Sequence, residues 1–196
     1  MSQFYPHTQY AEDQPYSRAI LTQHVLLRAF ELGGGAGLGF GTLAHFASRF
    51  AARKVPSPPS LQAAASSVAG EPLAEFPFNR PTSLKLIHSA GYGSFLGVLA
   101  LSFALIFRMR GKEDIEWKDR SWRLLENKGQ VQLDNWTLVG ALAGLGTVVS
   151  PPVARRYGGI AGLGWRGVVG GAALGSLAGL LGFSVTQAGS KSNKSQ

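Results

Sequence analysis

Charged residues divide the chain into four apolar stretches joined by polar segments. The clearest stretch, residues 86–107, has 22 residues without a formal charge. At about 1.5 Å per residue it would span roughly 33 Å, enough to cross a hydrocarbon core of about 30 Å. The first stretch is the weakest, because it reaches membrane length only by including the turn that carries Arg28 and Glu31. We expect transmembrane helices over residues 28–48, 86–107, 135–154 and 167–187.

These spans divide the chain into a polar N-terminal segment, a four-helix membrane domain and a flexible tail, over residues 1–17, 18–187 and 188–196. The proline-rich connector after the first span, which includes "KVPSPPS", predicts a loop, because proline interrupts regular helices. The segment 108–134 alternates acids and bases, so we expect an amphipathic helix at the membrane surface. Pro151 and Pro152 mark the expected end of the third helix. Four spans place both ends of the chain on the same side.

Glycine recurs at every fourth position within each span. In water, each glycine in a helix costs about 0.8–1 kcal/mol relative to alanine, so close packing against a second helix must offset the loss. Residues four apart share a helix face, and small residues there let two backbones approach closely within a membrane. We therefore predict an all-α integral membrane protein with four transmembrane helices and glycine-mediated packing. The packing residues are Gly33, Gly37, Gly41, Gly93, Gly97, Gly140, Gly144, Gly167, Gly171, Gly175 and Gly179, and the last four should form the tightest contact.

Composition agrees with a membrane protein, since only 15% of the residues are charged, against about 25% in ordinary soluble domains. The absence of cysteine excludes disulfides, thiolate metal sites and cysteine nucleophiles. The net charge of +8 suits anionic lipid or nucleic acid equally well. Six acidic residues lie from Glu113 to Asp134, around two tryptophans. They would weaken the positive potential that a surface needs to bind the phosphates of nucleic acid. We therefore expect membrane lipids and no nucleic acid among the partners.

Aromatic and basic residues of the amphipathic segment, with the basic pair after the third span, are the expected interfacial or partner contacts. Such residues gather at the headgroup level of membranes. They are Trp117, Trp122, Arg120, Arg123, Arg155 and Arg156.

His24, Arg28 and Glu31 share one helix face, and ionisable residues beside a membrane span raise a functional hypothesis. We favour the alternative of an ion pair at headgroup level. No histidine spacing indicates a metal site, and no catalytic constellation is recognisable. The match "GLGWRG" to a nucleotide-binding motif lacks the preceding strand and the later acid that such a motif requires. We expect no enzymatic activity, cofactor, metal or small-molecule substrate.

Four glycine-laced spans, a charged segment before the third, and Asp134-Asn135 leading into "WTLVGALAG" resemble the mitochondrial inner-membrane Tim-type translocase superfamily. That superfamily includes an accessory subunit of respiratory complex I. The chain is also similar to small uncharacterised membrane proteins of fungi. The resemblance implies a multi-pass protein of the mitochondrial inner membrane with an internal targeting signal. The absence of presequence character in residues 1–17 fits such a signal.

The resemblance leaves two functions open. The spans carry few polar side chains, whereas a protein-conducting channel needs a polar groove, so we favour a non-catalytic structural or assembly subunit. The expected assignment is an accessory subunit of complex I, in contact with other membrane subunits of a hetero-oligomeric complex. The alternative is a component of an inner-membrane preprotein translocase. Lysine and arginine counts slightly favour the side of the termini as the inside, whereas the resemblance implies the intermembrane space.

Overall fold

The structure, a computed structural model, describes residues 5–54 and 82–192, and this part of the chain is helical without a strand. The predicted all-α fold is therefore confirmed for these residues. The elements are a short 3-10 helix, η2, and the α-helices α1, α3, α4, α5, α6 and α7. Their bounds are Ala11–Asp13 (η2), Ser17–Lys54 (α1), Thr82–Met109 (α3), Asp114–Glu126 (α4), Lys128–Val149 (α5), Pro151–Tyr157 (α6) and Gly159–Ser192 (α7).

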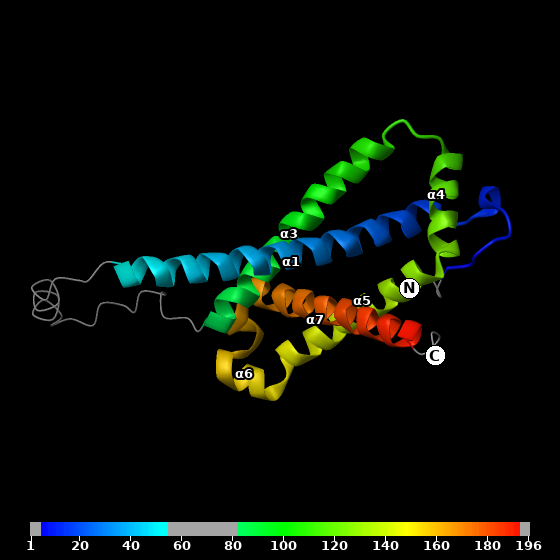
Figure 1. Cartoon of the computed structure of the whole chain (residues 1–196). Coiled ribbons are helices and arrows are strands. Elements are labelled where there is room, and N and C mark those ends of the chain that lie inside the picture. The colour runs from blue at the N-terminus through cyan, green and yellow to red at the C-terminus, as the bar shows by residue number, and fades with distance from the viewer. Residues whose placement is uncertain (1–4, 55–81, 193–196) are drawn as a thin grey trace, which may run out of the picture.

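The long helices form two antiparallel hairpins. Gly33 of α1 lies against Gly93 and Gly97 of α3, and Gly37 lies against Ser89 and Gly93. Later residues of α1 thus meet earlier residues of α3, so these two helices run in opposite directions. Helices α5 and α7 pair in the same way, and α3 and α7 join the two hairpins (Figure 1). Helix α4 crosses the end of the bundle beside the start of α1, where α7 also ends (Figure 1). The opposite end is occupied by α6 and the start of α3.

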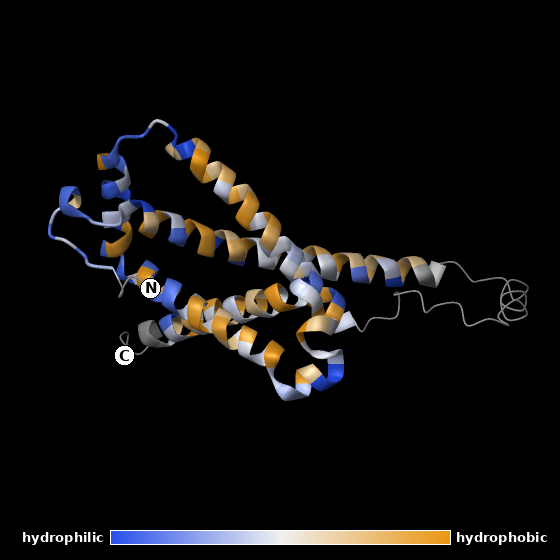
Figure 2. Ribbon diagram, turned by 180° about the vertical axis from the view of Figure 1, so that it is seen from behind, coloured by the Kyte–Doolittle hydropathy of each residue, from blue (hydrophilic) through white to orange (hydrophobic). Residues whose placement is uncertain are grey.

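Small residues form the interior where α1, α3 and α7 meet. Ala29, Ala90 and Ala173 are fully buried there, one on each of these helices. Large apolar residues instead face outward, and only 17% of the apolar part of α3 is buried. Apolar residues predominate along α3, α5 and α7, while hydrophilic residues gather on η2, α4 and α6 (Figure 2). This distribution fits helices that pack backbone to backbone and turn their bulky side chains toward lipid.

Two helices, α3 and α7, are long and apolar enough to cross a membrane, and the bent pair α5 and α6 can form a third span. Helix α1 does not reach the same hydropathy, because glycines, Thr42, His45 and Ser48 dilute its apolar residues. The prediction of four spans is therefore confirmed only in part. Helix α1 nevertheless packs along α3 as a span of the same bundle would.

The predicted third span, 135–154, falls within the bent pair α5 and α6, but it is not one straight helix. Helix α5 begins at Lys128, inside the segment 108–134 assigned to the membrane surface, and ends at Val149. The expected continuation to residue 154 is instead part of α6, which bends by 56° from α5. Proline is favoured in the first turn of a helix, where its missing N–H is not needed, so Pro151 and Pro152 start α6 as well as ending α5.

Glycine also permits two sharp changes of direction near α6. Gly158, with φ 75°, ends α6 in the left-handed conformation. Gly164, with φ 64°, breaks α7 within the "GLGWRG" sequence, where a residue with a side chain would be strained. The glycine in that sequence thus serves a backbone bend.

The remaining boundaries differ in smaller ways. The predicted tail, 188–196, begins too early, because α7 continues to Ser192, and 193–196 lie outside the described residues. The predicted proline-rich loop lies outside the described residues over 55–81. Within the polar N-terminal segment, η2 is the described helix that precedes α1.

Candidate functional site

The first glycine seam joins α1 to α3. A Cβ atom added at Gly33, Gly37, Gly93 or Gly97 would lie less than 3.0 Å from backbone atoms of the facing helix. Real Cβ atoms do not approach backbone so closely, so these positions require glycine for the observed separation. Gly41 differs, because its neighbours are the side chain of Ser89 and that of Leu86.

The second seam joins α5 to α7. Gly140 faces Gly175 and Gly179, and Gly144 faces Gly171 and Gly175, again through backbone atoms closer than 3.0 Å to an added Cβ. Thr147 and Ser150 at the end of α5 donate hydroxyl hydrogen bonds to backbone oxygens of the preceding turn, so they need no partner on α7. Both seams therefore depend on van der Waals contact between bare backbones.

Gly167 departs from the predicted stripe. An added Cβ there would meet Leu163 of the same helix and His88 of α3, so Gly167 lies outside the contact with α5. Sequence reasoning also missed Gly91 and Gly170, which bring α3 and α7 together through backbone contacts closer than 3.0 Å. These two glycines fall outside the four-residue repeats, so no periodic signal marks them.

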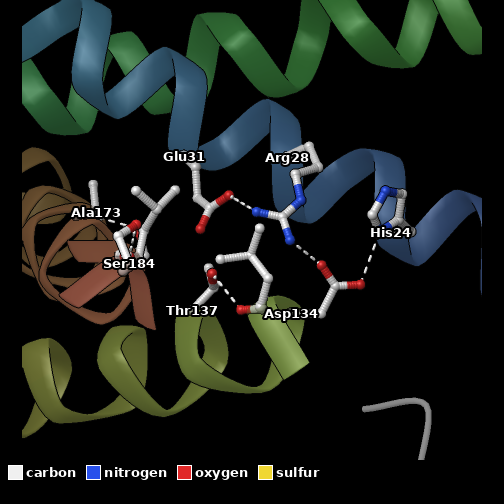
Figure 3. Close-up of polar contacts among 10 residues, drawn as sticks. His24, Arg28, Glu31, Asp134, Thr137, Ala173 and Ser184 are labelled. Atoms are coloured by element: carbon white, nitrogen blue, oxygen red, sulfur yellow. Dashed lines mark hydrogen bonds and ion pairs between the residues drawn. The ribbon is translucent and has the colours of Figure 1, made fainter. Parts of the chain in front are cut away.

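A cluster of charged side chains, the charge cluster, joins α1 to α5 and consists of His24, Arg28, Glu31 and Asp134 (Figure 3). Arg28 Nη1 donates a hydrogen bond to Glu31 Oε2, and Arg28 Nη2 donates to Asp134 Oδ1. His24 Nδ1 lies 2.8 Å from Asp134 Oδ2. The side chains of Arg28, Asp134 and Glu31 are 18%, 12% and 3% exposed.

The charge cluster is thus buried between helices of the same chain. The sequence predicted the Arg28 and Glu31 pair on α1 but assigned Asp134 to the surface segment. The sequence feature that could have indicated this contact is the position of Asp134 directly before an uncharged span, where it can belong to the same helix as the span.

One guanidinium serves two carboxylates in this cluster. With its amide oriented by the surrounding donors, Gln130 also accepts hydrogen bonds from Arg28 Nε at 3.2 Å and Nη2 at 3.0 Å. Glu31 Oε1 is buried and has no hydrogen-bond partner within the described residues. Burying unpaired charge is costly, so Arg28 is the residue that makes burial of both carboxylates tolerable.

The predicted interfacial residues of α4 contact the N-terminal part of the same chain. Trp122 Nε1 donates a hydrogen bond to the backbone oxygen of Thr8 at 2.9 Å, and the ring of His7 stacks on Trp122. The guanidinium of Arg18 lies 5.7 Å from the centre of the Trp117 ring. These contacts hold α4 across the end of the bundle.

The predicted basic contacts are distributed over both ends. Arg123 Nε pairs with Asp119 Oδ1 at 3.0 Å, and Arg120 Nη1 contacts the sulfur of Met109 at 3.1 Å. Arg155 and Arg156 are exposed on α6, where the guanidinium of Arg156 lies over the ring of Tyr157. Within the described residues, no group of three His, Asp or Glu side chains could hold a metal ion.

The geometry defines an all-helical protein with two helices, or three with the bent pair, that could cross a membrane. No protein-family model matches the chain, and no curated protein matches it.

Proposed function

We propose that the protein is a non-catalytic structural or assembly subunit of a complex in the mitochondrial inner membrane, specifically an accessory subunit of respiratory complex I. The resemblance of its glycine-laced spans to the Tim-type superfamily supports the location. The observation that carries the role is the projecting half of α1, which extends past its neighbours in the bundle (Figure 1).

Helix α1 is longer than a single crossing requires. Its 38 residues correspond to about 57 Å, against about 30 Å for a hydrocarbon core. Leu43, Phe46 and Phe50 lie at i, i+3 and i+7 on this projecting half, and their exposed fractions are 67%, 53% and 62%. Anchors with this spacing lie on one face and suit a groove on another protein. An exposed apolar stripe of this kind marks an interaction surface.

Removing the two aromatic side chains of this stripe should release the protein from its complex. We expect the double variant Phe46→Ala and Phe50→Ala to insert normally but to migrate free of the complex on a native gel. The matched control is Phe103→Ala with Phe107→Ala, an equally exposed aromatic pair on α3, which should remain in the complex. Co-migration of the α1 variant at the wild-type level would contradict the proposed interface.

Native purification in mild detergent, followed by mass spectrometry of the associated proteins, tests the assignment itself. Recovery of complex I membrane subunits is the expected result. Crosslinking to an arrested precursor, without complex I subunits, would instead identify a preprotein translocase component and overturn the assignment.

The proposal includes four spans, with α1 as the first. Because the chain has no cysteine, single-cysteine variants report membrane sidedness without background. Glu12→Cys and Glu113→Cys should react with an impermeant reagent from one side and Arg155→Cys from the other, since all three positions are exposed. If Glu12→Cys reacts from the side of Arg155→Cys, α1 does not cross the membrane.

A further inference from the structure

The first half of α1 and the last turns of α3 diverge toward α4 (Figure 1), and a groove lies between them. Its lining includes Leu26 of α1, with Leu105, Ile106 and Met109 of α3, and it has a volume of about 500 Å³. Sites for small molecules commonly have volumes of about 300–1,000 Å³. The groove is thus large enough to hold part of an amphiphile.

The lining of the groove changes from apolar to basic along its length. Between Ser102 and Arg110, about 12 Å along α3 at 1.5 Å per residue, the lining passes from aliphatic side chains to a guanidinium. Trp117 of α4 lines the same end as Arg110. Tryptophan and arginine are typical of the headgroup level of a bilayer, whereas Leu105 and Ile106 belong to the apolar part of α3. The groove therefore runs from the hydrocarbon region to the membrane surface.

Positive charge at the surface end is left without a partner. The side chains of Arg108 and Arg110 form no ion pair, hydrogen bond or ring contact with another residue in 5–54 or 82–192. Arg120 contacts the sulfur of Met109, which is a weak acceptor. Arg110 is the arginine that lines the groove, and its guanidinium is left for an external anion.

Two acidic residues near this end of the groove, Asp114 and Glu116, pair with basic residues other than Arg110. Asp114 lies 3.5 Å from Arg18 and 3.6 Å from Lys118, and Glu116 lies 3.0 Å from Lys112. None of these pairs includes Arg110, and no ion pair joins Arg110 to Glu113 within the described residues, so the Arg110 guanidinium can meet an external anion. Glu116 Oε2 is buried without a hydrogen-bond partner there. An aliphatic floor with a cationic mouth complements a molecule that has an apolar chain and a negative headgroup.

We propose that this groove binds one anionic phospholipid, with its phosphate at Arg110 and one acyl chain along Leu26, Leu105 and Ile106. A zwitterionic lipid would bring its own positive group toward Arg110 and would lose part of this attraction. The site does not depend on which complex contains the protein.

Lipid competition on the purified full chain tests the site. The protein in mild detergent is mixed with equal amounts of phosphatidylglycerol and phosphatidylcholine of the same chain length, and retained lipid is measured by native mass spectrometry. We expect retention of phosphatidylglycerol to exceed that of phosphatidylcholine by about fivefold, the effect of one arginine near an anionic headgroup. Arg110→Gln should bring the two lipids to equal retention. Arg155→Gln, at the opposite end of the bundle, should keep the wild-type ratio.

Two further arms separate a lipid from its headgroup alone. Ser102→Trp places a bulky ring in the aliphatic part of the groove and should lower retention of phosphatidylglycerol with Arg110 intact. An excess of glycerol phosphate, which has no acyl chain, should leave the bound lipid in place. Equal retention of the two lipids by the wild type, an unchanged ratio in Arg110→Gln, or displacement by glycerol phosphate would each overturn the proposal.

Discussion

Replacing Gly37 with leucine is expected to separate α1 from α3. An added Cβ at Gly37 would lie 2.2 Å from the backbone oxygen of Ser89, and a leucine adds three more carbons. Inserting extra groups into a packed interior costs about 1–3 kcal/mol, and a backbone neighbour cannot move aside as a side chain can, so we expect a loss of about 3 kcal/mol or more. The midpoint of thermal denaturation of the detergent-solubilised protein should fall accordingly.

Gly39 provides the matched control on the same helix. Nothing lies within 4 Å of a Cβ added there, so Gly39→Leu should change the free energy of unfolding by no more than about 0.5 kcal/mol. The pair Gly144 and Gly146 offers the same comparison on α5, because Gly144 faces the α7 backbone and Gly146 faces open space. Similar losses at the packed and the open position would show that the seams do not hold the hairpins together.

Replacing Arg28 with leucine is expected to be as damaging, for an electrostatic reason. The substitution leaves the carboxylate of Glu31 buried without its ion-pair partner and that of Asp134 with His24 alone. Removing one partner of a buried ion pair costs about 3–5 kcal/mol, because the remaining charge has lost its compensation. The loss should be measured by the same thermal denaturation in detergent.

A rescue variant distinguishes charge compensation from a simple loss of packing. Replacing Arg28, Glu31 and Asp134 together by leucine removes the charges as a set, and such replacements are often neutral or stabilising. We therefore expect the triple variant to regain most of the stability lost in Arg28→Leu. Arg123→Leu, which breaks the exposed pair with Asp119, should cost no more than about 1 kcal/mol. A triple variant that remains as unstable as Arg28→Leu would exclude this explanation.

Long stretches without formal charge predicted the helices well. The uncharged stretch 86–107 lies within α3, and the stretch 167–187 lies within α7. The boundary between the surface segment and the third helix was missed, because Lys128 and Asp134 interrupt the apolar pattern that marks the start of a span. Asp134 contacts His24 and Arg28 of α1, and contacts between distant segments are invisible to a local pattern.

The four-residue glycine repeat indicated which residues face a neighbouring helix, but could not say which helix each would meet. Gly140 and Gly175 carry the same local signal as Gly33 and Gly93, yet the two pairs lie in different hairpins. Asp134 was likewise missed from the charge cluster, since its partner Arg28 lies 106 positions earlier in the chain. Pairing of this kind depends on the tertiary arrangement.

In the proposed arrangement of four spans, with α1 as the first, the charge cluster has a consequence for the order of membrane insertion. Helices α1 and α3 emerge from the ribosome before α5, so the first hairpin can close through its glycine seam while Asp134 is still untranslated. During that interval His24 and Arg28 face the position that α5 will later occupy, without its carboxylate. Ionisable groups are expensive in lipid, so the early hairpin should stay beside an insertase or in the headgroup region until the second hairpin arrives. The same residues that hold the finished bundle together thus delay the release of its first half.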